Sequence, residues 1–330
     1  MILFSVILLV TFFCLHKDDK DGMEKTKLLP IRGILCVLIV LHHIYREFPD
    51  IFPRIFFIYN NVGFWIVSLF FFFSGYGLAV SNDKKVRYLS IHFIKGKIHK
   101  ILFPSLVIFV IYILAYSFVG EFTFKNWWLL TSNGQCIPSS HWFVYVLFIQ
   151  YFLFFLCYRL KCQYSFYFYI LSTLILMLFL YIIDFPSIWY KSTIFMPLGI
   201  LYYERKNHGA LKKIVVVVVV LICMIVYGLF KHDIILYKTF GNIFLSVAII
   251  AMFLFFSTHY VVKSKLWNLF GKNSMYIYMV HQPVLDSLKG FMVDSNLYFI
   301  EGATILVVII SLALAILFNR VQVKNYIKFV

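Results

Sequence analysis

Ionisable residues occur inside long apolar runs of this sequence, where they are costly. The run IRGILCVLIVLHHIY at residues 31–45 contains Arg32 near its start and His42 and His43 near its end. Ionisable side chains inside a membrane mostly face the bundle interior or a water-filled cavity, and they mark functional sites. Histidine exchanges protons close to neutral pH, so this run is a candidate for proton-transfer chemistry.

Helical spacing relates these residues to one another. Over the eleven residues from Arg32 to His43, an α-helix returns to within about 20° of its starting face and rises about 16 Å. His42 points about 80° away from that stripe. We therefore expect Arg32 and His43 to share a face, with His43 the better candidate for a general base. The alternative is an arginine that snorkels to the headgroups and a histidine that bonds a neighbouring helix.

Three further segments carry polar groups at the ends of apolar runs. The segment FFFSGYGLAVS places Ser74 among small residues, SSHWFVYVLFIQYF contains His141 and Trp142, and NSMYIYMVHQPV contains His281. Helix packing explains small residues equally well, and an aromatic belt explains the tryptophan. Three histidines at a similar depth on separate helices nevertheless indicate a site near one face of the membrane.

The composition decides which elements hold these residues. The chain has 330 residues, of which 62% are hydrophobic and 13% charged, whereas a soluble domain is about half apolar and a quarter charged. We predict an all-α, polytopic transmembrane helix bundle with about ten spans, most of them near the length that a bilayer requires. The predicted spans are 30–48, 62–80, 101–119, 141–158, 165–183, 190–203, 214–230, 240–260, 274–288 and 302–319. The sixth is short and contains Lys191 and Pro197. The run of valines within 214–230 should be helical in lipid despite its β-branched composition.

The first residues form a separate hydrophobic stretch, MILFSVILLVTFFCLH. It lacks the basic start and small-residue cleavage site of a signal peptide. It is either an extra short helix or an extension upstream of Met23. We therefore divide the chain into a hydrophobic extension with a polar linker at 1–22 and a membrane domain at 23–330.

The net charge of +16 reflects membrane topology better than nucleic-acid binding. With the start of the first span placed in the cytoplasm, 22 of the 30 lysines and arginines fall in inner loops and seven in outer loops. This asymmetry predicts a cytoplasmic C-terminus. The six cysteines form no C-x-x-C pair, so we expect neither a disulfide framework nor a metal site.

The motifs together resemble the acyltransferase-3 family of integral membrane O-acyltransferases. The similarity extends over residues 25–320, and each motif occupies the expected helix. The matching residues are Arg32 and His43 of an R-x10-H pattern, Phe71 to Gly75 of F-F-x-x-S-G, His141 to Phe143 of an H-W-F-like element, and Tyr278, His281 and Pro283 of Y-x-x-H-x-P.

The resemblance implies transfer of an acyl group, most simply acetyl, from cytoplasmic acyl-CoA to a hydroxyl of a surface glycan or lipid-linked sugar precursor. Acetyl-CoA would be a co-substrate, and no permanently bound cofactor is expected. The expected partners are the acyl-CoA, the glycan acceptor and membrane lipids, with no nucleic acid, and the expected location is the cell membrane, plasma or inner.

The resemblance also suggests roles for individual residues. His43 would be the base or would carry the acyl group transiently, and Arg32 would orient the donor. His281, His141 and Trp142 are candidates for acceptor binding. One departure concerns the donor. Lys97 and Lys100 replace the arginine pair that the family commonly has in its first large cytoplasmic loop, so the fork of arginine is lost while the charge is kept. Ser74 is a candidate for lining the donor path.

Two other classes of protein remain compatible with the residues themselves. A transporter or flippase of lipid-linked sugars also needs polar groups inside a bundle, and inverted repeats would favour it. A non-catalytic scaffold or sensor would not need histidines on a common face. Incubation with labelled acetyl-CoA and a glycan acceptor distinguishes these classes.

Overall fold

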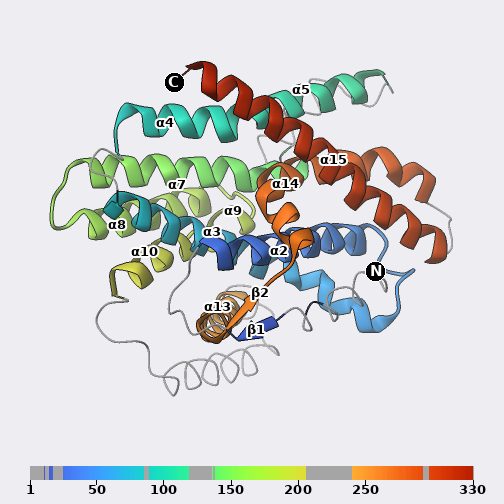
Figure 1. Cartoon of the computed structure of the whole chain (residues 1–330), viewed down its shortest axis with the longest axis horizontal. Coiled ribbons are helices and arrows are strands. Elements are labelled where there is room, and N and C mark those ends of the chain that lie inside the picture. The colour runs from blue at the N-terminus through green and yellow to red at the C-terminus, as the bar shows by residue number, and fades with distance from the viewer. Residues whose placement is uncertain are drawn as a thin grey trace. The chain divides into compact units, whose positions relative to one another are not determined.

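The structure is a computed structural model that describes residues 11, 15–17, 25–84, 89–118, 136, 138–205, 240–292 and 297–329. Helices dominate these residues, and a small antiparallel sheet pairs Leu15–Lys17 with Tyr260–Val262 (Figure 1). The all-α membrane bundle is confirmed. The predicted span at 214–230 and most of the N-terminal hydrophobic stretch lie outside the described residues.

The elements follow the chain in a simple order (Figure 1). They are β1 (Leu15–Lys17), α2 (Lys25–Glu47), η2 (Arg54–Phe57), α3 (Ile58–Lys84), α4 (Ile91–Lys97), η3 (Ile98–Leu102), α5 (Phe103–Phe118), η4 (Ser139–His141), α7 (Trp142–Arg159), α8 (Ser165–Ile182), α9 (Ile188–Lys191), α10 (Phe195–Arg205), α13 (Asn242–His259), β2 (Tyr260–Val262), α14 (Lys265–Met292) and α15 (Leu297–Phe329).

The chain forms two compact units, which we describe separately. The first unit comprises Met1–Ile66 and Leu211–Asn319, and the second comprises Val67–Ala210 and Arg320–Val330. Helices α3 and α15 each begin in the first unit and end in the second.

In the part of the chain that the structure describes, six helical segments are long and apolar enough to cross a membrane. They are Thr26–Glu47, Ile58–Lys84, Ile91–Leu114, Ser139–Arg159, Ser165–Ile182 and Leu297–Val321. Each corresponds to a predicted span. Helix α8 illustrates why: Tyr169 and Thr173 are fully buried, whereas Leu171 and Ile175 are 54% and 59% exposed. Exposed apolar side chains of this kind are suited to contact with lipid.

Three predicted spans differ from the structure. The segment 190–203 is broken into α9 and α10, and the 11 residues of α10 rise only about 16 Å, short of the roughly 30 Å of a bilayer core. The segment 240–260 contains the shorter apolar helix Asn242–Ser257. The segment 274–288 is part of α14, a 28-residue helix with charged residues. Burial against protein allows α14 to be more polar than a helix exposed to lipid.

The first unit is built on α14, which packs along α2. Lys27 is 4% exposed, and its ammonium donates to the backbone oxygen of Ser257 at 3.3 Å. A lysine at this place satisfies a carbonyl in the last turn of α13 and favours the negative end of the helix dipole. Lys27 precedes the predicted first span at 30–48 and is counted among the inner-loop lysines, but it belongs to α2 and is buried. The indole nitrogen of Trp267 donates to Thr11 at 2.9 Å.

The second unit contains a buried polar cluster between α7 and α8. Gln150 accepts hydrogen bonds from the Tyr169 hydroxyl at 2.6 Å and from the Thr173 hydroxyl at 3.2 Å. Helix α4 continues into α5 through the π-helical turn η3 (Figure 1). Turns of this kind insert an extra residue into a helix and are frequent at functional sites.

Candidate functional site

Helices α2 and α14 run parallel at close range. Cys36 contacts the backbone oxygen of Ser274, 238 residues later, and the ring of His43 contacts that of His281 at the same sequence separation. Gly33 and Gly271 explain the close approach: a Cβ atom at Gly33 would meet the Trp267 backbone oxygen, and one at Gly271 would meet that of Leu29. The two glycines thereby bring the backbones into contact and set the register of the pair.

Three imidazole rings lie in a row in the first unit, which we call the histidine row: His42, His43 and His281. The ring centroids of His42 and His43 are 5.1 Å apart, and those of His43 and His281 are 4.9 Å apart. His42 is 8% exposed and His281 is fully buried, whereas the central His43 is partly exposed. His43 is thus the most exposed residue of the row.

Backbone hydrogen bonds determine the tautomer of His281. Its Nδ1 donates to the carbonyl oxygens of Tyr278 at 2.8 Å and Ile277 at 3.2 Å. Because Nδ1 carries the proton, Nε2 of the neutral ring is an acceptor. His281 therefore presents a proton-accepting nitrogen on a ring whose orientation its own helix holds in place.

His42 is held by the start of α3. Its Nδ1 donates to the backbone oxygen of Tyr59 at 2.6 Å, and a Cβ atom at Gly63 would overlap its ring. The absence of a side chain at Gly63 thus makes room for the imidazole. This contact positions the segment that carries His43, and it assigns His42 to packing between α2 and α3.

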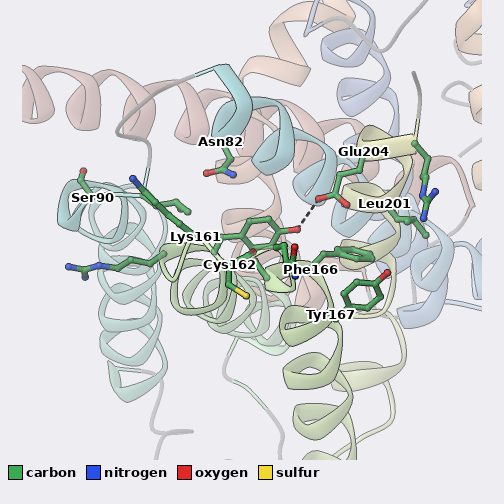
Figure 2. Close-up of a pocket in the computed structure, with 14 residues that line it drawn as sticks. Asn82, Ser90, Lys161, Cys162, Phe166, Tyr167, Leu201 and Glu204 are labelled. Atoms are coloured by element: carbon green, nitrogen blue, oxygen red, sulfur yellow. Dashed lines mark hydrogen bonds between the residues drawn. The ribbon is translucent and has the colours of Figure 1, made fainter. Parts of the chain in front are cut away.

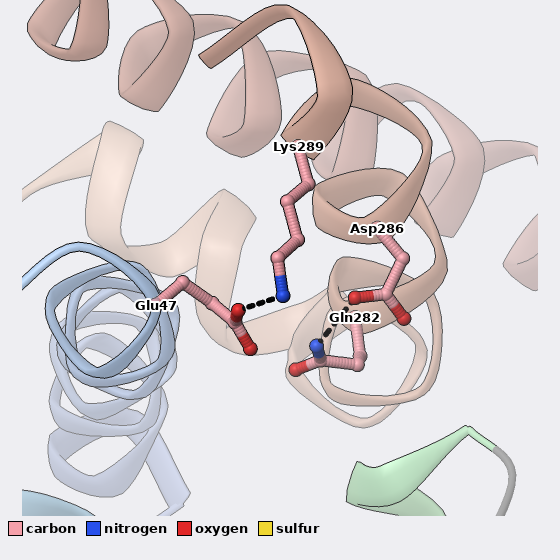
Figure 3. A network of polar contacts seen from close by, with 4 residues as sticks. All are labelled: Glu47, Gln282, Asp286 and Lys289. Carbon is pink, nitrogen blue, oxygen red and sulfur yellow. Dashed lines mark hydrogen bonds and ion pairs between the residues drawn. The ribbon is translucent and has the colours of Figure 1, made fainter. Parts of the chain in front are cut away.

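Beyond the histidine row, the α2–α14 pair carries a network of charged and amide side chains (Figure 3). Lys289 forms an ion pair with Glu47, and the Gln282 amide donates to Asp286 at 2.9 Å. Gln282 is 4% exposed, and its side-chain oxygen accepts no hydrogen bond from the residues that the structure describes. These groups are chemically suited to hydroxyl-rich ligands, because carboxylates and amides both bond sugar hydroxyls.

Arg32 lies on the same helix as His43, as the spacing predicts. It is partly exposed and precedes Gly33, where α2 touches α14. The rise of the helix separates the Cα atoms of Arg32 and His43 by about 16 Å. A single ligand that contacted both residues would have to span this distance.

The predicted residues of the second unit have packing contacts of their own. Ser74 is partly exposed on α3, and the adjacent Gly75 packs against the backbone of Met196 on α10. Gly199 makes the reciprocal contact with Phe72. Close helix packing therefore accounts for the glycine of this segment, and the role of Ser74 in the donor path stays a prediction.

His141 and Trp142 stand where η4 meets α7. His141 is fully buried, and its Nδ1 lies 3.2 Å from the Ser105 hydroxyl on α5. The Trp142 ring lies 6.4 Å from that of Trp189. These contacts fix η4 to its neighbours, and a part in acceptor binding stays a prediction for both residues.

Lys97 and Lys100 do not lie in a loop, which corrects the expectation for them. Lys97 ends α4, and Lys100 belongs to η3 within one continuous helical segment. The Lys97 ammonium lies 3.7 Å from the centroid of the Tyr151 ring and 5.4 Å from that of Phe93. It is thus engaged in cation–π contacts with aromatic faces. The π-helical turn η3 joins α4 to α5 without a loop. The spacing of the lysines does not reveal this turn.

Sequence reasoning missed the ion pair and the amide–carboxylate pair of α14. The amide–carboxylate pair has a signal in the sequence, because Gln282 and Asp286 are four residues apart and so share one helix face. The sequence does not pair α2 with α14, so the ion pair could not be inferred.

Comparison with families of known proteins identifies the chain. The family model of the acyltransferase-3 family, described as an acyltransferase domain, matches residues 31–319. This range contains Arg32, the histidine row and the acidic and amide groups beyond it. Comparisons with curated proteins and with solved structures gave no match. The family match covers most of the chain, and the protein therefore belongs to the acyltransferase-3 family of membrane acyltransferases.

Proposed function

We propose that the protein is an O-acyltransferase that moves an acetyl group from acetyl-CoA to a hydroxyl of a surface glycan or lipid-linked sugar precursor. The observation that carries this proposal is the contact between the ring of the partly exposed His43 and that of the buried His281, 4.9 Å between centroids. An imidazole next to a second imidazole of fixed tautomer is suited to general base catalysis.

The reaction follows from these groups. His43 removes the proton of the acceptor hydroxyl as its oxygen attacks the thioester carbonyl, and the C–S bond breaks as the new ester bond forms. The thiolate of CoA leaves and takes up the proton that His43 has accepted. His281 keeps His43 in place and offers Nε2 as an acceptor close to the imidazolium that forms transiently.

The acceptor binds at the end of the α2–α14 pair that carries Gln282, Asp286, Glu47 and Lys289. Glu47 follows His43 by four residues and Asp286 follows His281 by five, so these groups lie about one turn beyond the histidines. Carboxylate and amide oxygens accept hydrogen bonds from sugar hydroxyls. One hydroxyl held in this way would face His43.

The donor approaches from the cytoplasm. The excess of lysine and arginine in the loops on one side supports this orientation, with the C-terminus cytoplasmic and the protein in the cell membrane. Arg32 lies towards that side of α2 and orients the donor by its charge. The pantetheine arm of CoA is long enough to span the distance from Arg32 to His43.

Label transfer tests the proposal. The purified chain is incubated with acetyl-CoA labelled in the acetyl group and with a lipid-linked oligosaccharide, and label in the glycan is measured. Alkali-labile label on the acceptor, released as acetate, supports O-acetylation. Movement of the glycan across a vesicle membrane without labelling would instead identify a flippase.

A further inference from the structure

A pocket in the second unit lies among the ends of several helices (Figure 2). It has a volume of about 870 Å³, within the range of small-molecule sites, roughly 300–1,000 Å³. Its walls come from the C-terminal ends of α3, α7 and α10 and from the segments that lead into α4 and α8. These ends share one side of the second unit, the side that the distribution of basic residues assigns to the cytoplasm.

The charge of this pocket is strongly positive. Arg159, Lys161 and Arg205 contribute cations from three different parts of the chain. Among the lining residues that the structure describes, Glu204 contributes an acid, and it accepts a hydrogen bond from the Tyr158 hydroxyl at 3.1 Å. Guanidinium and ammonium groups are the side-chain groups best suited to binding phosphate oxygens.

The backbone conformation of Lys161 is a second observation that favours a functional role for its side chain. Lys161 has a φ of 50°, the left-handed conformation that glycine and asparagine adopt at lower cost than other residues. Its amide bonds the Tyr158 oxygen at 3.2 Å, which closes the tight turn between α7 and α8. Backbone strain of this kind clusters at functional sites. Replacing the lysine with asparagine removes the charge and suits the turn.

Aromatic and neutral polar groups complete the lining. Phe166 and Tyr167 follow Ser165 at the start of α8, and Tyr167 is 62% exposed. Planar side chains of this type stack on nucleobases. Asn82 and Ser90 add neutral hydrogen-bonding groups from the other wall.

We propose that this cationic pocket binds a phosphate-bearing ligand. Its phosphates come from the nucleotide end of the acyl-CoA donor or from the headgroup of an anionic phospholipid. The first source rests on the proposed function, and the phosphate site itself does not. The pocket is distinct from Lys97 and Lys100, neither of which lines it.

Calorimetry on the full-length chain in neutral detergent tests the site with adenosine 3′,5′-bisphosphate, which has the phosphates and base but no acyl group. We expect Lys161→Asn to weaken binding by about tenfold, the order expected for one charge-assisted hydrogen bond. Arg205→Gln should act in the same direction. Lys84→Asn is the matched control, because Lys84 ends α3 outside the pocket lining, and it should leave binding nearly unchanged.

A second arm identifies the source of the phosphate. The protein is placed in phosphatidylcholine vesicles with and without phosphatidylglycerol, and lipid retained through purification is measured. Nucleotide binding that depends on Lys161 identifies the acyl-CoA donor as the source of the phosphate. Retention of phosphatidylglycerol that depends on Lys161 identifies the lipid headgroup as the source. If both probes bind Lys161→Asn and Arg205→Gln as well as the parent chain, or if neither probe binds the parent chain, the proposal is overturned.

Transfer assays separate this proposal from the proposed function. If the bisphosphate binds but no acyl group is transferred from any acyl-CoA to any hydroxyl, the phosphate site is supported and the proposed O-acyltransferase function is refuted. Transfer from acetyl-CoA with an unchanged KM for the donor in the Lys161→Asn and Arg205→Gln variants, together with unchanged lipid retention, refutes the phosphate site and leaves the enzyme.

Discussion

The histidine row and the cationic pocket differ in how tightly they are packed and in the charged groups that they contain. The row has His42 and His281 buried on either side of a partly exposed His43, and its helices touch backbone to backbone through Gly33 and Gly271. The pocket places Arg159, Lys161 and Arg205 around a space of about 870 Å³. One region is close-packed and rich in histidines, and the other is an open pocket lined by arginine and lysine.

This difference indicates how the two tasks of an acyltransferase divide. Proton transfer needs a group held in a defined geometry, and a shift of about 1 Å can cost 10²-fold in rate. Binding of a polyanion needs fixed positive charge, and it tolerates water and mobile side chains. The five predictions below test this division, beginning with the largest expected effect.

His43→Ala should lower acetyl transfer by about 10²–10⁴-fold, because general base catalysis contributes about that much. Binding of adenosine 3′,5′-bisphosphate should not change, since the base does not hold phosphates. Label incorporation measures the first quantity, and calorimetry measures the second. Loss of bisphosphate binding in His43→Ala would break the proposed division between chemistry and binding.

Gly271→Ala should destabilise the protein by about 1–3 kcal/mol, the usual cost of overpacking. The added Cβ would meet the backbone of Leu29, which cannot move aside as a flexible side chain can. Gly290→Ala, on the same helix, is the control, because nothing lies within 4 Å of the Cβ position. Thermal unfolding in detergent compares the two variants. Equal melting temperatures would show that close packing does not organise the histidine row.

His42→Ala should reduce transfer less than His43→Ala does, by about tenfold, because its role is to hold α2 against α3. His42→Asn should restore most of that loss, since the asparagine amide can donate to the Tyr59 oxygen that Nδ1 now bonds. The readout is kcat at equal protein level. A lower activity for His42→Ala than for His43→Ala would reverse the assignment of the base.

Salt should affect the two regions differently. Raising the ionic strength from 0.01 M to 0.15 M shortens the Debye length from about 30 Å to about 8 Å, so we expect the KM for the donor to rise severalfold. The kcat should stay nearly constant, because close helix packing sets the geometry of the histidine row, and ions do not screen packing contacts. Potassium chloride titration of the transfer reaction measures both. A fall in kcat with an unchanged KM contradicts the expected pattern.

The ion pair between Glu47 and Lys289 should have the smallest effect. Its side chains are 28% and 45% exposed, respectively, and partly exposed pairs of this kind contribute about 0–1 kcal/mol. A double-mutant cycle of Glu47→Gln and Lys289→Met, followed by thermal unfolding, gives the coupling energy. A coupling of several kcal/mol would mean that this end of the α2–α14 pair is sealed from solvent.

Much of the fold could be predicted because lipid constrains sequence strongly. Six predicted spans correspond to long apolar helices, since each must bury all its backbone groups in apolar surroundings. Helix α14 was harder to delimit: its full extent from Lys265 to Met292 includes charged residues that are tolerated only because α2 covers it. Helix α10 likewise packs against the backbone of α3 at Gly199, a contact that no local pattern encodes.

The sequence predicted which residues of the candidate site share one helix, but it did not predict which helices are neighbours. The 3.6-residue period relates Arg32 to His43, and the two do lie on one helix. The contact of His43 with His281 depends on which helices are neighbours, and no local pattern encodes that choice. The buried position of Lys27 and the cation–π contacts of Lys97 follow in the same way from tertiary partners, so both lysines looked like ordinary loop charges.

The parallel pairing of α2 with α14 has a consequence for biosynthesis. The contacts that align the pair join residues 238 positions apart, so a ribosome must make most of the chain before His43 meets His281. Until then, α2 is in the membrane without α14, and His43 lacks its neighbour His281. Long-range contacts form slowly, and polar groups that are exposed before α14 is made can pair with the wrong helix. Nascent chains that end before α14 should therefore be inactive and should depend on insertion factors or membrane chaperones for protection.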